Sequence, residues 1–181
     1  MKTISLTTII ALVAIFFSFV SAAQEEPVST EQSDDSLIFV LPQESNAELT
    51  LIVPPEGFEP TDKFNGYLHV QASSGIIMTM IENANHVKMD EGMTDDFFKA
   101  NQLTLIERKD IKSDNLVSGT LYKCSFTTGE TPFIRYIVFA GDLNKTLILH
   151  ITYPSKIEGL VEPEILKSIQ SITLNPTRDE K

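Results

Sequence analysis

The segment that most constrains the fold is TPFIRYIVFAG, residues 131–141. Successive side chains of a β-strand point to opposite faces of the sheet, and here both sets are apolar apart from Arg135. The two sets are Phe133, Ile137 and Phe139 on one face, and Ile134, Tyr136 and Val138 on the other. A strand that is apolar on both faces needs cover on both faces. This segment therefore predicts a central strand between two covering layers.

The neighbouring segments extend this strand into an antiparallel meander. SGTLYKCSF (118–126) and KTLILHITYP (145–154) read as strands, and the turns TTGE and GDLN, each with a glycine, join them to 131–141. A closing helix is predicted over 162–172, with Pro163 near its start. One stripe of that helix is apolar, at Ile165, Ile169 and Ile172. The pattern predicts an α+β domain, an antiparallel sheet with helices on both faces (an α/β/α sandwich).

The first part of the domain also contains strand patterns. LIFVLP (37–42) and AELTLIVP (47–54) predict two strands, and the prolines of PPEGFEP then interrupt the chain. GYLHVQASS (66–74) and GIIMTMIE (75–82) fit either a hairpin or one interrupted strand.

A polar stretch and a helix follow. NANHVKMDEG (83–92) is predicted to be a loop. Thr94 is a good N-cap for a helix that has Asp95 and Asp96 in its first turn. LTLIERKDI (103–111) fits either the end of that helix or the start of a strand.

The N-terminus has the pattern of a secretory signal peptide. Lys2 precedes an apolar run, and small residues follow it, which places the cleavage site near Ala22 and Ala23. The apolar run is short for a membrane-spanning helix, which needs about 20 residues. We therefore expect residues 1–23 to be removed, leaving no stable membrane insertion and an exported protein that is periplasmic or secreted.

Composition divides the rest of the chain. Residues 24–36 are acidic and contain almost no large apolar side chain, as expected of a flexible linker. A single α+β domain is expected over 37–175, with a polar tail over 176–181. Cleavage removes Lys2 and changes the formal net charge from −11 to −12. A chain with this net negative charge has no electrostatic attraction to the phosphates of a nucleic acid, and no nucleic-acid partner is expected.

Two short patterns resemble modification sites. Asp35-Ser36-Leu37 resembles an O-glycosylation acceptor of some bacterial lineages. Asn144-Lys145-Thr146 fits the N-glycosylation tripeptide, but it lies in an expected turn and is read as one.

The order of elements resembles the PsbP-like (Mog/PsbP-like) superfamily, as an exported bacterial member. The resemblance covers 37–174 and depends on VPPEGF, on RY in the middle strand, on LILHITYP and on ILKSI in the closing helix. It implies an α/β/α sandwich. Photosystem PsbP proteins assist a manganese–calcium centre and Mog proteins bind a nuclear GTPase. No site of either maps residue by residue onto this chain, so the resemblance implies no function.

Few residues suggest chemistry. Weak binding candidates are His69, His86, Arg135 and His150. Arg135 lies in an apolar strand, where a charge needs a partner; it either meets a carboxylate or carbonyl, or lines a groove for an anionic ligand. His150 lies on the strand face of Thr146, Ile148 and Thr152, beneath or beside a helix. No catalytic set, metal site or cofactor is predicted.

The lone cysteine, Cys124, shares a strand face with Tyr122 and Phe126 and is expected to be a buried hydrophobe. An exported chain with one thiol forms no internal disulfide. We expect a non-catalytic exported accessory or binding module whose partner is an envelope or extracellular protein. The alternative is a small-ligand-binding protein or a hydrolase whose site is assembled from residues distant in sequence.

Overall fold

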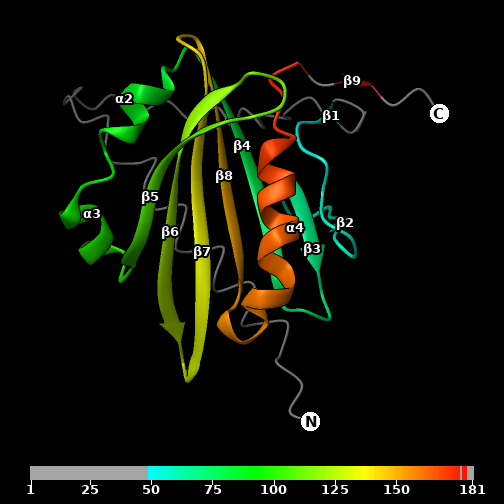
Figure 1. The fold of residues 1–181 in the computed structure, drawn as a ribbon, viewed down its shortest axis with the longest axis vertical. Helices are drawn as coiled ribbons and strands as arrows, with labels where there is room; N and C mark the ends of the chain where they lie inside the picture. Colours follow the sequence, from blue (N-terminus) through cyan, green and yellow to red (C-terminus); the bar gives the residue numbers. More distant parts are fainter. Residues whose placement is uncertain (1–48, 176, 179–181) are drawn as a thin grey trace, which may run out of the picture. The chain divides into compact units, whose positions relative to one another are not determined.

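The computed structural model describes residues 49–175 and 177–178, and seven of its strands form one antiparallel sheet in the order β2-β3-β4-β8-β7-β6-β5 (Figure 1). The strands of the sheet are β2 (Glu59–Pro60), β3 (Gly66–His69), β4 (Ser74–Glu82), β5 (Thr104–Lys112), β6 (Ser118–Thr128), β7 (Thr131–Gly141) and β8 (Lys145–Pro154). Strands β1 (Leu49–Thr50) and β9 (Thr177–Arg178) pair with each other. The helical elements are α2 (His86–Asp90), α3 (Asp95–Ala100), the 3-10 turn η2 (Ser155–Ile157) and α4 (Glu158–Gln170). The class is α+β.

Strand β7 lies inside the sheet, between β6 and β8. All its residues from Phe133 to Gly141 are buried, which confirms the prediction that this strand is covered on both faces. The expected meander of three strands, β6, β7 and β8, is also confirmed. Strand β8 pairs in addition with β4, so the hairpin β3–β4 extends the same sheet.

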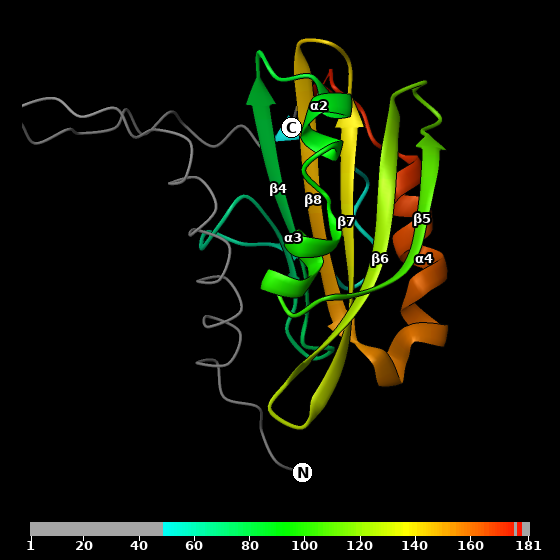
Figure 2. The ribbon, with the colours of Figure 1, turned by 90° about the vertical axis from the view of Figure 1, so that its left-hand side faces the viewer.

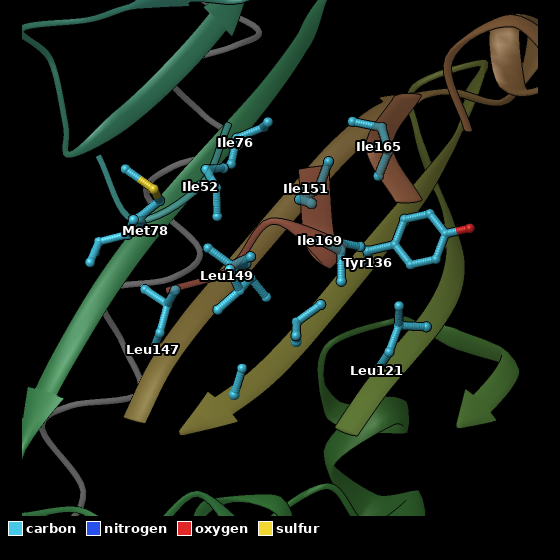
Figure 3. Close-up of a cluster of buried hydrophobic side chains, with 14 of the residues drawn as sticks. Ile52, Ile76, Met78, Leu121, Tyr136, Leu147, Leu149, Ile151, Ile165 and Ile169 are labelled. Atoms are coloured by element: carbon cyan, nitrogen blue, oxygen red, sulfur yellow. The ribbon is translucent and has the colours of Figure 1, made fainter. Parts of the chain in front are cut away.

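One face of the sheet builds the larger hydrophobic cluster (Figure 3). Leu149 and Ile151 of β8 pack there with Tyr136 of β7, and Ile165 and Ile169 of α4 belong to the same cluster. Fully burying a side chain the size of Ile165 contributes about 2 kcal/mol to stability. Ile165 and Ile169 of the predicted apolar stripe are therefore on the buried side of the closing helix, and Ile172 is buried in the same cluster two residues beyond its end at Gln170.

The opposite residues of the same strands build a second cluster. Ile137 and Phe139 of β7 pack with Cys124 of β6, and Phe98 of α3 joins them. Figure 2 shows α2 and α3 in front of the sheet in that view and α4 on its far side. Cys124 is buried, as predicted.

Helix α3 begins where the sequence predicts. The Thr94 hydroxyl accepts a hydrogen bond from the Phe97 amide at 3.2 Å, and Asp95 and Asp96 occupy the first turn. The segment 103–111, left open between helix and strand, is strand β5 at the edge of the sheet.

The predicted loop over 83–92 is wrong in its middle. It contains α2, whose N-cap is Asn85: its side chain accepts a hydrogen bond from the Val87 amide at 2.9 Å. Five residues make too short a helix to be legible from periodicity. The contacts of Asp90 with Tyr122 and Arg108 of the sheet stabilise it instead.

The predicted strand over 47–54 is also mostly wrong. Of its described residues, 49–54, only Leu49 and Thr50 form a strand, and the following residues are irregular although Leu51 and Ile52 are buried. The chain there lies against the end of α4: the Thr173 amide donates to the Leu51 carbonyl at 2.9 Å. Leu51 and Ile52 are apolar because they are buried in the core, and the resulting run of apolar residues resembles a strand in the sequence. The predicted strand over 37–42, the leader and the linker lie outside the described residues.

The closing helix begins earlier than predicted, at Glu158 rather than 162. Pro163 lies inside it, where the ring removes one backbone hydrogen bond that would reach Gly159. The prediction placed the start at Pro163 because proline favours the first turn. Among the described residues, no helix is both long enough and apolar enough to span a bilayer.

Candidate functional site

The sheet register brings two of the four candidate residues together. Arg135 of β7 is opposite Thr152 of β8, and Ile137 is opposite His150. Directly paired residues of an antiparallel sheet share a face, so Arg135 and His150 are diagonal neighbours on one face. Cys124 of β6 is opposite Arg135 on its other side. We call Cys124, Phe126, Arg135, His150 and Thr152 the Arg135 cluster.

Arg135 is buried, with 6% of its surface exposed, and it contacts groups of both neighbouring strands. Its Nε donates a hydrogen bond to Thr152 Oγ1 at 3.2 Å. Its guanidinium carbon lies 4.4 Å from the centre of the Phe126 ring, within the range of a cation–π contact. Phe126 in turn stacks on Phe133, with ring centres 5.5 Å apart.

Burial determines the protonation states in this cluster. It lowers the pKa of Arg135 to about 10, which leaves the guanidinium charged at neutral pH. Burial, together with the charge of Arg135, lowers the pKa of His150 to about 3, so the imidazole is neutral at neutral pH. Burial also raises the pKa of the Cys124 thiol to about 11, with Arg135 opposing the shift. The cluster thus combines one fixed cation with a neutral ring and a protonated thiol.

The other two candidates lie elsewhere and have local contacts. His69 of β3 meets Phe58 edge-on at 5.5 Å, and its Nδ1 accepts a hydrogen bond from the Ala72 amide at 3.4 Å. A methyl group added at Gly57, where φ is +80°, would lie 2.8 Å from His69 Nε2. His69 is therefore packed against the turn that precedes β2. This packing requires glycine at position 57.

His86 begins α2 and faces the turn between β7 and β8. Its Nδ1 donates to the Asp142 carbonyl at 3.2 Å, and its amide donates to the same oxygen at 3.4 Å. His86 therefore fixes the start of α2 to that turn. Neither His69 nor His86 joins the Arg135 cluster through any of these contacts.

An acid–base network that no sequence pattern predicted lies under α4. Lys123 Nζ lies 2.6 Å from a carboxylate oxygen of Glu158 and 2.6 Å from one of Glu162. The Tyr136 hydroxyl donates to Glu162, and burial together with this contact raises the Tyr136 pKa. Hydrogen bonds from Lys123 and Tyr136 lower the pKa of Glu162. The sequence predicts a helix that starts at residue 162, which leaves Glu158 outside it. Glu158 and Glu162 were therefore not recognised as an i, i+4 pair on one helix face.

A second network attaches α2 to the sheet. The Tyr122 hydroxyl donates to Asp90 Oδ1 at 2.7 Å, and Arg108 Nη2 lies 3.0 Å from Asp90 Oδ2. Arg108 Nε also donates to the Tyr122 hydroxyl at 3.3 Å. Burial raises the pKa of Tyr122. The ionisable groups of both networks therefore have structural partners. In the part of the chain that the structure describes, no three His, Cys, Asp or Glu side chains are grouped to hold a metal ion.

Comparisons with known proteins give structural likenesses of low identity. No family model matches the chain, and no curated protein matches it. A Pseudomonas aeruginosa protein of unknown function aligns at a TM-score of 0.46 with 15% identity, over 57% of this chain and 74% of that one. The solution structure of cyanobacterial PsbP from Synechocystis aligns at 0.46 with 9% identity, over 67% and 79%. A Bacteroides thetaiotaomicron crystal structure aligns at 0.45 with 10% identity, over 72% and 46%.

Proposed function

We propose that this protein is an exported, non-catalytic accessory or binding module that acts on an envelope or extracellular protein. The observation that carries the proposal is the charge state of the Arg135 cluster. At neutral pH its imidazole is uncharged and, with a pKa of about 3, a weak base, and its thiol is not the reactive thiolate. A fixed guanidinium can still attract an anionic group. This chemistry supports binding better than nucleophilic or acid–base catalysis.

The proposal includes a fold of the PsbP-like α/β/α type, with helices covering both faces of the sheet. Its support is the division of the core into two clusters. Side chains of α4 belong to one cluster, and Phe98 of α3 belongs to the other. The two clusters draw on alternate residues of β7, which point to opposite faces. Residues 37–174, over which the sequence resembles the superfamily, include the whole sheet.

A second function is favoured by one specific observation, the placing of a buried cation beside His150. A small-ligand-binding protein would use Arg135 to meet a carboxylate or phosphate on this face of the sheet. A hydrolase would need, in addition, a base and a nucleophile near that ligand. The low pKa of His150 and the high pKa of Cys124 favour the ligand-binding form of this alternative.

The test compares protein capture with ligand binding. The mature domain and its Arg135→Met variant are used as bait in envelope extract, and both are melted with a panel of carboxylates, phosphates and metal ions. Arg135→Met removes the donor to the Thr152 hydroxyl, a loss that costs about 1–3 kcal/mol. Binding by the two proteins is therefore compared at a temperature at which both are folded, so that any lost binding is not due to unfolding.

The expected result is a specific protein partner and no ligand-dependent rise in melting temperature. A rise with a phosphate or carboxylate that the Arg135→Met variant loses, with no protein recovered, would replace the proposed function by the small-ligand alternative. Hydrolysis of a generic ester or phosphoester substrate that disappears in the same variant would contradict a non-catalytic role.

A further inference from the structure

One connection crosses an entire face of the sheet. Strand β4 ends at Glu82 and β5 begins at Thr104, and β8, β7 and β6 lie between these two strands in the sheet. We call the connecting residues 83–103 the strap; it contains α2 and α3. Figure 2 shows both helices in front of the sheet. The strap therefore passes over three strands between its two covalent attachments, one at β4 and one at β5.

The strap covers apolar side chains of β6 and β7. Four of these side chains belong to one cluster and are each at most 7% exposed: Tyr122, Cys124, Ile137 and Phe139, which we call the Cys124 surface. The two other buried members of the cluster, Phe98 and Leu103, both belong to the strap. Among the described residues, the strap is therefore the element that covers the Cys124 surface.

Both ends of the strap are in the left-handed conformation. Asn83 directly follows β4 and has φ of +59°, and Gln102 lies two residues before β5 and has φ of +54°. This conformation is uncommon in residues other than glycine, and surrounding contacts must hold it in place. The movement of a loop is absorbed by φ and ψ changes at a few residues near the ends of the moving segment. Asn83 and Gln102 occupy such positions.

The strap is held by few buried apolar side chains. Phe98 and Leu103 are its only buried residues, and helix α2 contributes none. Helices of five and six residues are not stable by themselves. On the opposite face, α4 has thirteen residues, and the cluster there buries Ile165, Ile169 and the following Ile172. The strap is therefore attached to the sheet by less apolar contact than α4.

Polar contacts supply the rest of the attachment. Asp90 accepts a hydrogen bond from the Tyr122 hydroxyl at 2.7 Å and pairs with Arg108 at 3.0 Å. The Ala84 amide donates to the Asn144 carbonyl at 3.2 Å, near the start of the strap. Asp90 is thus the strap residue whose side chain bonds to β5 and β6. Removing its carboxylate should release the strap without changing the Cys124 surface itself.

We propose that the strap opens as one unit about Asn83 and Gln102 and uncovers the Cys124 surface, while the sheet and α4 stay folded. A region with few buried apolar contacts opens at a lower free-energy cost than the whole domain. Cys124 is also a member of the Arg135 cluster, so opening brings solvent to one side of that cluster. The strap is therefore a gate on the sheet face that carries Arg135. This gate does not depend on what that face binds, and it goes beyond the proposed function.

The test uses the one cysteine of the chain as a reporter of opening. Cys124 is 0% exposed, so a maleimide can reach it only after its cover has moved. The protein, as purified from producing cells, is incubated with the maleimide in native buffer, and alkylation is followed by intact mass. When reclosing is faster than alkylation, the rate reports the population of the open form. This population is compared with the globally unfolded fraction obtained from urea unfolding.

Three variants separate strap opening from global unfolding. Asp90→Asn removes the charged acceptor that bonds the strap to the sheet, and we expect alkylation about tenfold faster. Asp110→Asn is the matched control, because Asp110 also pairs with Arg108, at 3.5 Å, but lies on β5; its rate should equal that of wild type. Ile165→Val removes one buried methylene on the α4 side and destabilises the whole domain. We expect it to lower the urea midpoint and leave the alkylation rate unchanged.

We expect the wild-type protein to react about tenfold or more faster than its globally unfolded fraction allows. A rate no faster than that fraction allows, raised by Ile165→Val in proportion to its loss of stability, would show that only global unfolding exposes Cys124. That result overturns the gate, and it decides the question even where Asp90→Asn does not fold. Equal rates for Asp90→Asn and wild type, or for Asp90→Asn and Asp110→Asn, would also contradict it.

Discussion

A single charged residue, Arg135, controls the electrostatics of one face of the sheet. The sequence indicated that a charge within an apolar strand needs a partner. The structure shows two of its partners, the Thr152 hydroxyl and the Phe126 ring. The carboxylate or carbonyl that the sequence predicts stays a prediction. The charge of Arg135 also opposes protonation of His150 on the neighbouring strand. The protonation of His150 therefore depends on the charge of Arg135. The sequence does not predict this coupling, because the two residues are far apart in it.

His150 should make the domain sensitive to acid. Its folded-state pKa, about 3, is below the ordinary value of 6.5, so the unfolded chain binds this proton more readily than the native protein. The contribution of neutral His150 to the free energy of unfolding is complete above about pH 6.5. It is lost as pH falls toward 3, by up to about 1.4 kcal/mol per pH unit. Urea unfolding at a series of pH values measures this loss.

The matched variant for this measurement is His150→Asn, which keeps a polar side chain that does not titrate. Protonation of carboxylates lowers the stability of both proteins, and the difference between the two curves isolates His150. We expect wild type to lose more stability than the variant between about pH 6.5 and pH 3. Parallel curves would show that His150 is readily protonated in the folded state.

At the scale of single elements, contacts with the sheet decide where the helices lie. Helix α2 has five residues, too few to be stable alone, and Asp90 attaches it to Tyr122 and Arg108. Helix α4 is attached twice, by its apolar stripe and by Lys123, which reaches both Glu158 and Glu162. The register of α4 on the sheet is thus specified by apolar and charged contacts together.

Lys123→Met should weaken the attachment of α4. The substitution keeps the length and apolar stem of the side chain but removes the cation between two carboxylates. Only 14% of the Lys123 side chain is exposed, so solvent screens this contact incompletely. We expect a loss of about 1–2 kcal/mol in the free energy of unfolding.

Lys167→Met is the control for that substitution. Lys167 also pairs with a glutamate of α4, Glu164, at 2.7 Å, but its side chain is 69% exposed. An exposed helix pair of this kind contributes about 0.5 kcal/mol or less. Equal effects of the two substitutions in urea unfolding would mean that the Lys123 network does not hold α4.

At the scale of the whole molecule, the leading prediction is export. The signal-peptide pattern of residues 1–23 predicts a mature chain that begins near Ala23 or Gln24. Fractionation of producing cells, with intact-mass measurement of the purified protein, tests it. We expect the shortened chain in the periplasm or the medium. Recovery of the uncleaved precursor from the cytosol would contradict the localisation and, with it, the expected class of partner.

The sequence by itself determined the elements whose side chains repeat with a clear period. Strands β6, β7 and β8, the apolar stripe of α4 and the N-cap of α3 all follow from local patterns, because the physical causes of those patterns act within a few residues. The same local patterns misassigned Leu51 and Ile52, because apolar residues buried by a distant helix end resemble a strand.

The tertiary structure alone decided which distant side chains meet. The pairing of β7 with β8 put Arg135 beside His150, and the packing of α4 put Glu158 and Glu162 on Lys123. The strap crosses three strands and buries Cys124 together with Phe98 of α3. Such encounters depend on strand register and helix docking, which are set by the whole core rather than by any one segment.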